Sequence, residues 1–322
     1  MFTAIVVTRA IFDVLMGMGW LKRLRMLQFF GETKLDFINK RRLFFLVSSV
    51  VIIGGLAMFF ARGERAYGID FAGGQLQEYR FDQPVAVERL RQHLSGAGLG
   101  EVQLQQFGDP REILIRTAGD TAERVQAILR EQIQTPFERR RVEFVGPIVG
   151  QQLRRQAFWA ILGALVGISV YVAFRFRQWD FGLAGVIALF HDVLVALGAL
   201  AVTNRELSLT LVAGLLTIAG FSINDTIVIY DRVRENQRLV RKATLAELIN
   251  LSINQMLSRT ILTSATVIMA VVALYVVGGQ VLQDFAFCLL IGFISGVYST
   301  VYIAGALVVT WRQRRLAVAV RR

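Results

Sequence analysis

The sequence has 322 residues, of which 54% are hydrophobic and 19% are charged. With a mean hydropathy of +0.50, this composition is typical of a membrane protein and excludes a disordered or ordinary soluble chain. One cysteine and two histidines exclude a disulfide framework and a zinc site of the Cys/His type. No metal or cofactor is expected. Because no Walker-type glycine loop occurs, nucleotide hydrolysis is not expected either.

The net charge of +12 is unevenly distributed. Residues 1–42, 231–259 and 312–322 carry eight, six and five basic residues, whereas residues 62–155 carry 14 basic and 13 acidic ones. With six spans, the basic segments all fall on one side of the membrane, which the positive-inside rule makes cytoplasmic. A nucleic-acid partner is not expected, because the basic residues are not interleaved with aromatic residues on a soluble face.

The first segment, residues 1–30, is expected to be a cytoplasmic or interfacial tail. It is apolar at its start but contains Arg9 and Asp13, which can pair on one helix face at i, i+4. It lacks the basic beginning and the cleavage site of a signal peptide. An amphipathic helix at the membrane surface is therefore expected, followed by a basic cluster at residues 22–25. Residues 31–61 then supply a lead-in and the first span.

Six apolar runs are long enough to cross about 30 Å of hydrocarbon. In chain order they are residues 43–61, 157–174, 181–202, 207–230, 259–278 and 285–311. The last five, with their connections, make up residues 156–311, and a basic tail covers residues 312–322. The pattern predicts a membrane bundle of six transmembrane helices with both termini in the cytoplasm.

One long polar insert, residues 62–155, separates the first and second runs. Alternating apolar residues predict strands, and apolar residues at helical spacing predict helices. The strands are expected at 74–81, 101–107, 113–117 and 137–145, and the helices at 85–96 and 121–134. This βαββαβ order is that of the ferredoxin-like α+β unit. A ferredoxin-like domain is therefore expected on the outer, periplasmic side of the membrane.

An aspartate lies within the fourth apolar run, where a bilayer disfavours charge. Asp225 stands between Asn224 and Thr226, and a carboxylate at such a depth costs at least about 2.5 kcal/mol. We interpret it as a proton-transfer group, because a desolvated carboxylate can exchange a proton near neutral pH. A structural or helix-capping aspartate is the alternative.

Arg259 is assigned to proton transfer together with Asp225, and other polar residues in the spans are candidates for a supporting role: His191, Asp192, Asn224, Thr226 and Thr263. Arg259 can pair with the Asp225 carboxylate from the fifth span, on a stripe that includes Thr263; snorkelling of Arg259 to the headgroups is the alternative. His191 and Asp192 lie near mid-membrane in the third span. Adjacent residues point about 100° apart on a helix, so we expect these two not to touch. A structural hydrogen bond is the alternative role for Asp192.

A glycine-rich motif follows the first span. Gly68, Gly73 and Gly74 permit a tight change of direction, and Asp70 can hold the junction by a hydrogen bond. This motif is interpreted as a structural hinge rather than as a chemical site.

These motifs resemble those of a known family. Residues 68–74 (GIDFAGG) resemble the motif that opens the periplasmic domain of the SecD and SecF translocase subunits. Residues 188–192 resemble the SecF His-Asp motif, residues 222–236 its fourth-helix signature and residues 258–264 the start of its fifth helix. The resemblance covers about residues 30–315 and identifies the chain as a member of the SecF family, in the resistance-nodulation-division superfamily.

The beginning of the chain departs from the SecF pattern. Residues 2–9 resemble the cytoplasmic end of the last SecD membrane helix, and a usual SecF begins near residues 30–37. This indicates either a piece of a fused SecD–SecF chain or a reading frame that begins within a SecD-like coding region.

The resemblance implies a subunit that uses the proton-motive force to promote protein export across the bacterial cytoplasmic (inner) membrane. It places a functional arginine at Arg259 and implies that the periplasmic domain engages emerging polypeptide. The implied partners are SecD, the SecYEG translocon, YajC, the unfolded polypeptide and membrane lipid. A small-molecule exporter of the same superfamily and a structural subunit without proton transfer are the alternatives. No nucleophile–base constellation is visible, so an enzyme is not expected.

Overall fold

The chain divides into two compact units, Met1–Thr33 and Lys34–Arg322. This computed structural model describes residues 2–20, 33–99, 102–106, 109–176, 178–240 and 242–320. In the first unit, α1 (Phe2–Gly17) contains the expected ion pair between Arg9 Nε and Asp13 Oδ2, at 3.7 Å. The predicted basic cluster at residues 22–25 lies outside the described residues.

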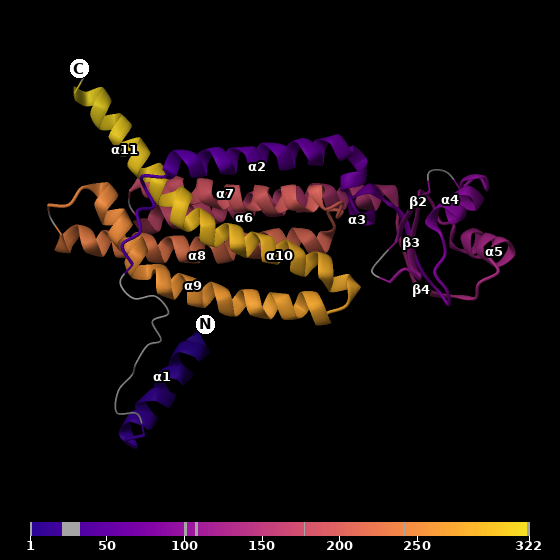
Figure 1. The fold of residues 1–322 in the computed structure, drawn as a ribbon, viewed down its shortest axis with the longest axis horizontal. Helices are drawn as coiled ribbons and strands as arrows, with labels where there is room; N and C mark the ends of the chain where they lie inside the picture. Colours follow the sequence, from indigo (N-terminus) through magenta and orange to yellow (C-terminus); the bar gives the residue numbers. More distant parts are fainter. Residues whose placement is uncertain are drawn as a thin grey trace. The chain divides into compact units, whose positions relative to one another are not determined.

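The second unit contains six helices that are long and apolar enough to cross a membrane, counted over the described residues (Figure 1). They are α2 (Arg41–Arg62), α6 (Pro147–Phe176), α7 (Trp179–Val202), α8 (Leu209–Leu239), α9 (Leu245–Val277) and the continuous helix formed by α10 (Gln280–Ser299), η2 (Thr300–Ala304) and α11 (Gly305–Val320). The predicted multi-pass membrane protein is confirmed.

The helices extend beyond the apolar runs that predicted them. α8 continues to Leu239 and α9 begins at Leu245, so the basic segment at residues 231–259 is mostly helical. At the start of α9, Thr244 and Glu247 form a reciprocal capping box, which satisfies two backbone N–H groups of the first turn. Hydropathy marks the part of a helix inside the bilayer, whereas capping sets where the helix begins.

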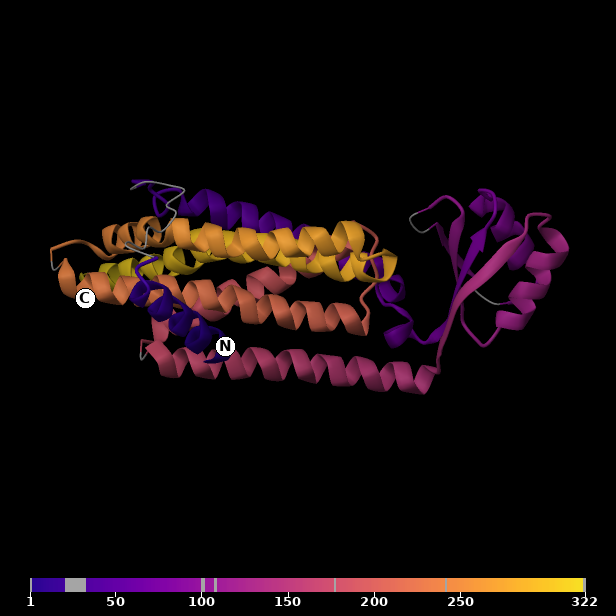
Figure 2. The same ribbon diagram turned by 90° about the horizontal axis from the view of Figure 1, so that it is seen from below.

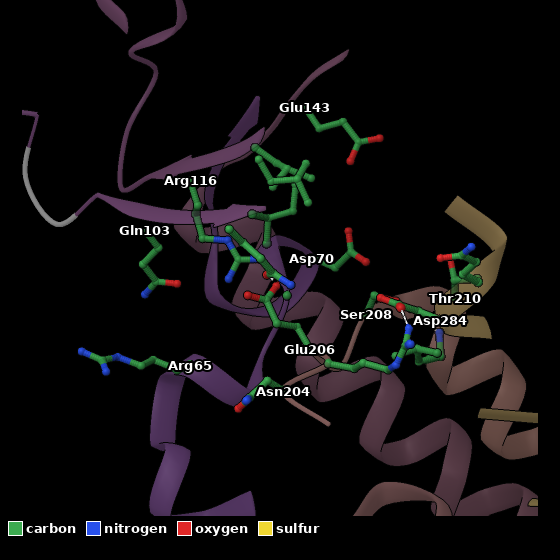
Figure 3. Close-up of a pocket in the computed structure, with 18 of the residues that line it drawn as sticks. Arg65, Asp70, Gln103, Arg116, Glu143, Asn204, Glu206, Ser208, Thr210 and Asp284 are labelled. Carbon is green, nitrogen blue, oxygen red and sulfur yellow. Dashed lines mark hydrogen bonds and ion pairs between the residues drawn. The ribbon is translucent and has the colours of Figure 1, made fainter. Parts of the chain in front are cut away.

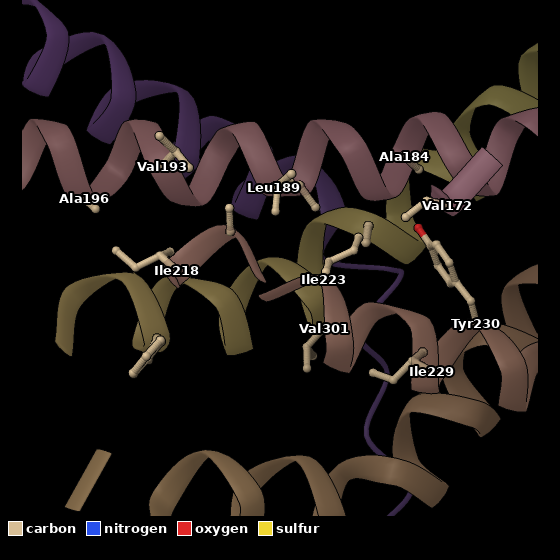
Figure 4. Close-up of a cluster of buried hydrophobic side chains, with 14 of the residues drawn as sticks. Val172, Ala184, Leu189, Val193, Ala196, Ile218, Ile223, Ile229, Tyr230 and Val301 are labelled. Atoms are coloured by element: carbon tan, nitrogen blue, oxygen red, sulfur yellow. The ribbon is translucent and has the colours of Figure 1, made fainter. Parts of the chain in front are cut away.

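Small residues let the central helices pack closely. A Cβ on Gly55 of α2 would stand 2.6 Å from the Cα of Gly198 on α7, so only glycine allows this crossing. Figure 4 shows Leu189 and Val193 of α7 beside Ile218 of α8, all in one buried cluster. α7, α8 and the sixth span are therefore the interior of the bundle.

The last span is not a uniform α-helix. Between α10 and α11, the segment η2 (Thr300–Ala304) is a π-helix. Such insertions are rare and occur frequently at functional sites, because they shift the side-chain register of a helix by one position. The segment begins directly after Ser299, a residue that is fully buried.

The insert forms a four-stranded antiparallel sheet with two helices. The elements are β1 (Gly74–Phe81), α4 (Val87–Ser95), β2 (Gln103–Gln106), β3 (Glu112–Thr117), α5 (Ala122–Gln132) and β4 (Phe137–Val145), with strand order β2-β3-β1-β4. Apolar side chains of β1, β3, α4 and α5 make its own core. Figure 2 shows the two helices lying against the sheet. Within the predicted strand at 101–107, Gln103–Gln106 form β2, and residues 101 and 107 lie outside the described residues.

Two short connections join the first span to the sheet. η1 (Gly63–Ala66) continues α2, and α3 (Ile69–Ala72) leads into β1. At the other end of the insert in the sequence, after β4, α6 begins at Pro147, within the predicted insert. Residues 147–155 thus belong to the same helix as the second span.

Candidate functional site

The Asp225 carboxylate lies inside the bundle, 8% exposed. It has one hydrogen-bond partner among the described residues: Ser264 Oγ of α9 donates to Oδ2 at 3.3 Å. The neighbouring Thr226 is buried and bonds Thr300 of η2 through its hydroxyl, at 2.9 Å. A carboxylate oxygen can accept more than one bond, so this group retains capacity for a proton or another donor.

The expected direct pair between Asp225 and Arg259 is not formed. The Arg259 side chain is exposed, and its guanidinium has no hydrogen bond or ion pair with any described residue. Ser264, which does reach Asp225, lies five residues further along α9. Five residues turn a helix by about 140° beyond a full turn, so Ser264 reaches the Asp225 carboxylate by a hydrogen bond, whereas Arg259 acts on it through its charge alone.

The polar stripe predicted on α9 faces outward. Arg259, Thr263, Thr266 and Ala270 are all exposed. The hydroxyl of Thr263 donates to the carbonyl of Arg259 at 2.9 Å, and so is satisfied within its own helix. Asn224 of α8 is exposed as well.

A second polar centre surrounds Asp192, which is completely buried. The carboxylate accepts hydrogen bonds from Ser222 of α8 at 2.5 Å, and from Ser295 and Ser299 of α10 at 2.7 Å each. His191 Nδ1 lies 2.9 Å from Asp192 Oδ1. The prediction that these two adjacent residues do not touch is wrong, because the side chains extend far enough from the helix for the imidazole and the carboxylate to reach hydrogen-bond distance.

The partners of Asp192 were not found from the sequence. Serines are common in membrane helices, and nothing in their local sequence marks the three that reach this carboxylate. One signal was available: Ser295 and Ser299 are spaced i, i+4 and therefore share a helix face. Their approach to Asp192 depends on how α10 packs against α7.

The glycine motif forms the junction between the first span and the sheet. Gly73 and Gly74 have φ values of +76° and +107°, which side chains strongly disfavour. Asp70 Oδ2 accepts a hydrogen bond of 2.8 Å from the backbone N–H of Leu209, the first residue of α8. The N–H of Gly68 donates to the carbonyl of Leu207 at 2.8 Å. The motif is thus fastened to the start of the helix that carries Asp225.

Ionic contacts reinforce this junction. Arg116 of β3 pairs with Glu206 in the connection between α7 and α8, and Arg62 Nη1 donates to the carbonyl of Arg205 at 2.9 Å. Burial raises the pKa of the Glu206 carboxyl, while the neighbouring Arg116 opposes the rise. These charges line a polar cleft of about 1170 Å³ between the sheet and this connection, where Figure 3 shows Asp70 and Glu206 near Arg116.

Metal-binding geometry is not found in the part of the chain that the structure describes. Within those residues, no group of three His, Cys, Asp or Glu side chains could hold a metal ion. The site consists of two buried carboxylates, an exposed arginine and a charged junction, an arrangement suited to holding and moving protons.

Comparison with known proteins gives consistent matches. Residues 124–314 match the family described as protein export membrane protein SecD/SecF, C-terminal. The chain is 36% identical over 303 residues to the protein translocase subunit SecF of Endomicrobium trichonymphae, covering 92% of this chain and 98% of that protein. It is 39% identical over 279 residues to SecF of Pseudomonas aeruginosa, covering 85% of this chain and 90% of that protein.

Solved structures match as well. The crystal structure of SecDF from Thermus thermophilus, a translocon-associated membrane protein, superposes with a TM-score of 0.87 at 36% identity. The match covers 97% of this chain, which spans 43% of the length of that one. A SecDF structure in a super-membrane-facing form gives a TM-score of 0.69 at 37% identity, covering 93% of this chain and 42% of that one.

Proposed function

Because the chain belongs to the SecF family of protein translocase subunits, we propose that it uses the proton-motive force to promote polypeptide export. The proton enters and leaves at Asp225, and no covalent chemistry is involved. The export partners in this proposal are SecD, the SecYEG translocon, YajC and the emerging unfolded polypeptide. The chain lies in the bacterial cytoplasmic membrane with both termini inside.

One observation carries the proposal. Asp225 lies on the helix whose first residue, Leu209, is held by Asp70 of the junction. The two positions are about 24 Å apart along α8, at about 1.5 Å per residue. A change in how α8 packs at Asp225 is therefore transmitted along a rigid helix to the base of the sheet domain. One charge moved across 100 mV supplies about 2.3 kcal/mol, enough to bias a two-state packing.

The proton alters the Asp225 contact directly. An ionised carboxylate can only accept from Ser264, whereas a protonated one donates as well. Protonation also removes a buried charge that α8 and α9 otherwise have to accommodate. We infer that the two forms favour different packings of α8 against α9.

The outward stripe on α9 supports a helical membrane partner. An arginine side chain facing hydrocarbon is costly unless it is paired, and the exposed Arg259 guanidinium makes no hydrogen bond or ion pair within the described residues. A partner helix that brings an acidic group to Arg259 would satisfy it, and the small residues of the stripe allow close approach. We assign this surface to SecD.

The sheet domain has the place and the form of a polypeptide-handling element. Its element order and its strand order β2-β3-β1-β4 support a ferredoxin-like assignment. Its near-neutral charge, against the basic segments on the other side, supports a periplasmic position. We propose that this domain moves with the junction and alternates between holding and releasing the exported chain.

The decisive variant is Asp225→Asn, which preserves size and hydrogen bonding but cannot ionise. In cells depleted of their own SecF, the variant should lose the proton-dependent part of precursor export, measured as the fraction of a secreted protein that is processed. It should still be made, inserted and co-purified with SecD.

The matched control is Asp231→Asn, which changes a carboxylate two turns further along α8. Asp231 pairs with Arg175 where both side chains are partly exposed, so the variant should export normally. Normal export by Asp225→Asn under a full gradient would leave Asp225 as a structural contact. In that case another group would carry the driving proton, or the chain would be a structural subunit.

A further inference from the structure

A continuous chain of hydrogen bonds runs across the bundle from α2 to α7. Tyr298 of α10 donates its hydroxyl proton to the backbone carbonyl of Phe44, at 3.0 Å. Ser48 Oγ lies 3.0 Å from the Tyr298 hydroxyl and 2.9 Å from His191 Nε2. His191 Nδ1 lies 2.9 Å from Asp192 Oδ1. Four contacts therefore join one carbonyl to one carboxyl group.

The direction of these bonds is fixed at the carbonyl end. A carbonyl oxygen only accepts, so the single hydroxyl proton of Tyr298 is used on Phe44. Ser48 then has to donate to the tyrosine oxygen, which leaves Ser48 as the acceptor toward the imidazole. His191 Nε2 consequently carries a proton and donates it to Ser48.

The fourth contact requires one more proton. Tyr298, Ser48 and a neutral imidazole supply three protons, and all three are used between Phe44 and His191. The contact between Nδ1 and Asp192 then needs either an N–H on the ring or an O–H on the carboxyl group. Four contacts thus require one proton more than a neutral histidine and an ionised aspartate contain together.

We propose that the His191–Asp192 pair is a second proton-binding site of the bundle. It holds one proton that is shared between imidazole Nδ1 and the carboxyl group, with Nε2 protonated in either form. The two groups bind and release this proton as a unit. Release leaves one link of the chain without a proton, and so weakens the attachment of α2 to α7 and α10.

The surroundings accommodate the proton in either position. The serines of α8 and α10 donate to Asp192 whether the carboxyl group is ionised or neutral, since each oxygen has two lone pairs. The titratable groups on the packed elements are Tyr298 of α10, stacked on the His191 ring with centroids 5.8 Å apart, and Tyr302 of η2. Asp225 lies one turn beyond Ser222 on α8 and bonds Ser264 of α9.

The site is placed where a proton can affect helix packing. Ser299, which donates to Asp192, is the last residue of α10 before the π-helix η2 begins. The chain of bonds also joins α2, the span that leads into the junction motif. This inference does not depend on Asp225 carrying the driving proton, because it rests on a separate set of contacts.

Histidine ¹⁵N spectroscopy tests the proposal directly. The sequence has two histidines, His93 and His191, so His93→Gln leaves a single imidazole in the full-length protein. With ¹⁵N-histidine incorporated and the protein in lipid bilayers, Nε2 should give the signal of a protonated nitrogen at pH 7. A bare Nε2 nitrogen at pH 7, with Nδ1 protonated, would overturn the proposal.

Tyr298→Phe tests whether the hydrogen-bond chain holds the proton. Without the tyrosine hydroxyl, Ser48 is free to donate to Nε2, so a neutral imidazole satisfies every remaining contact. At pH 7, Nδ1 should therefore be protonated and Nε2 bare in this variant, whereas Nε2 is protonated in the parent.

The matched control is Tyr302→Phe. Tyr302 packs against the Tyr298 ring with centroids 5.4 Å apart, but its hydroxyl makes no hydrogen bond to any described residue. Its imidazole ¹⁵N signals should match those of the parent. If Tyr298→Phe and Tyr302→Phe give the same imidazole signals, the hydrogen-bond chain does not hold the proton and the proposal is wrong. A failure of the Asp225 proposal would appear in export and leave these spectra unchanged.

Discussion

The two buried aspartates differ in how fully their oxygens are used. Asp192 has four partners, whereas Asp225 has one, Ser264. A buried polar group with every bond made is rigidly held, and breaking it leaves several donors unsatisfied. A carboxylate with one weak bond can change partners at small cost. The difference supports the proposed exchange at Asp225, and at Asp192 it supports a proton that is shared within a fixed set of helix contacts.

Glycine is required at Gly74 for two separate reasons. Its φ of +107° is disfavoured for any side chain, and a Cβ there would lie 2.6 Å from the carbonyl oxygen of Thr117. Gly74→Ala should therefore lower the free energy of unfolding by about 1–3 kcal/mol, measured on the sheet domain by denaturant titration. Gly119→Ala is the control, because a Cβ there meets no atom within 4 Å. Equal stability of the two variants would contradict this account of the junction.

At the scale of elements, α8 carries the buried Asp225 and also anchors the base of the sheet domain. Its middle carries Asp225, and its beginning is bound by Asp70 and capped by the Ser208 hydroxyl. Its end extends past the apolar run to Leu239. A single helix thus connects the basic segment, the proposed proton site and the sheet domain. The π-helix η2 contacts it through Thr300, which bonds Thr226.

The sheet domain should fold alone and show a specific acid dependence. Residues 66–146 contain a complete apolar core. Hydrogen bonds from Arg111 lower the pKa of Asp109 from 3.8 to about 2. A lowered pKa in the folded state contributes stability above the unfolded value of 3.8, and this contribution is lost as the pH falls through about 2. Thermal unfolding of the isolated domain should therefore shift to lower temperature over this range.

Asp109→Asn should remove that component and flatten the dependence on pH. The control is Asp82→Asn, since Asp82 is exposed and its carboxylate makes no hydrogen bond or ion pair to a described residue. The control should follow the parent curve. A random-coil circular dichroism spectrum at neutral pH would show that the domain does not fold by itself.

At the scale of the whole membrane unit, the six spans differ in how they are used. α7, α8 and the sixth span are largely buried among the others, whereas α2, α6 and α9 leave most of their surface exposed. Lipid tails satisfy apolar surface, and the hydroxyls of Thr263 and Thr266 are satisfied within α9, but lipid tails do not satisfy the guanidinium of Arg259. A second membrane subunit would therefore gain the most stabilisation by packing against the exposed stripe on α9.

Orientation is testable by cysteine labelling. The native Cys288 is buried, so single cysteines can be added at Gln126 in α5 and Gln237 near the end of α8. In intact cells, a membrane-impermeant maleimide should label the cysteine at position 126 and not the one at position 237, because basic segments stay in the cytoplasm. Equal labelling, or labelling of position 237 alone, would reverse or abolish the proposed topology.

The sequence by itself determined the features that depend on local pattern. Hydropathy located the six spans, alternation located strands in the insert, and the i, i+4 spacing of Arg9 and Asp13 predicted their ion pair. Each of these signals arises from residues within a few positions of one another. The unusual depth of Asp225 and Asp192 was visible for the same reason.

Only the tertiary structure decided which groups these carboxylates meet. Asp192 meets serines 30 to 107 positions away, and Asp225 meets Ser264 rather than Arg259. A helix turns about 100° per residue, so small differences in helix rotation determine which of several neighbouring polar side chains reaches a given partner. That rotation is set by the packing of whole helix faces, through contacts such as that between Gly55 and Gly198. Such contacts join residues far apart in the sequence, so a local pattern does not predict them.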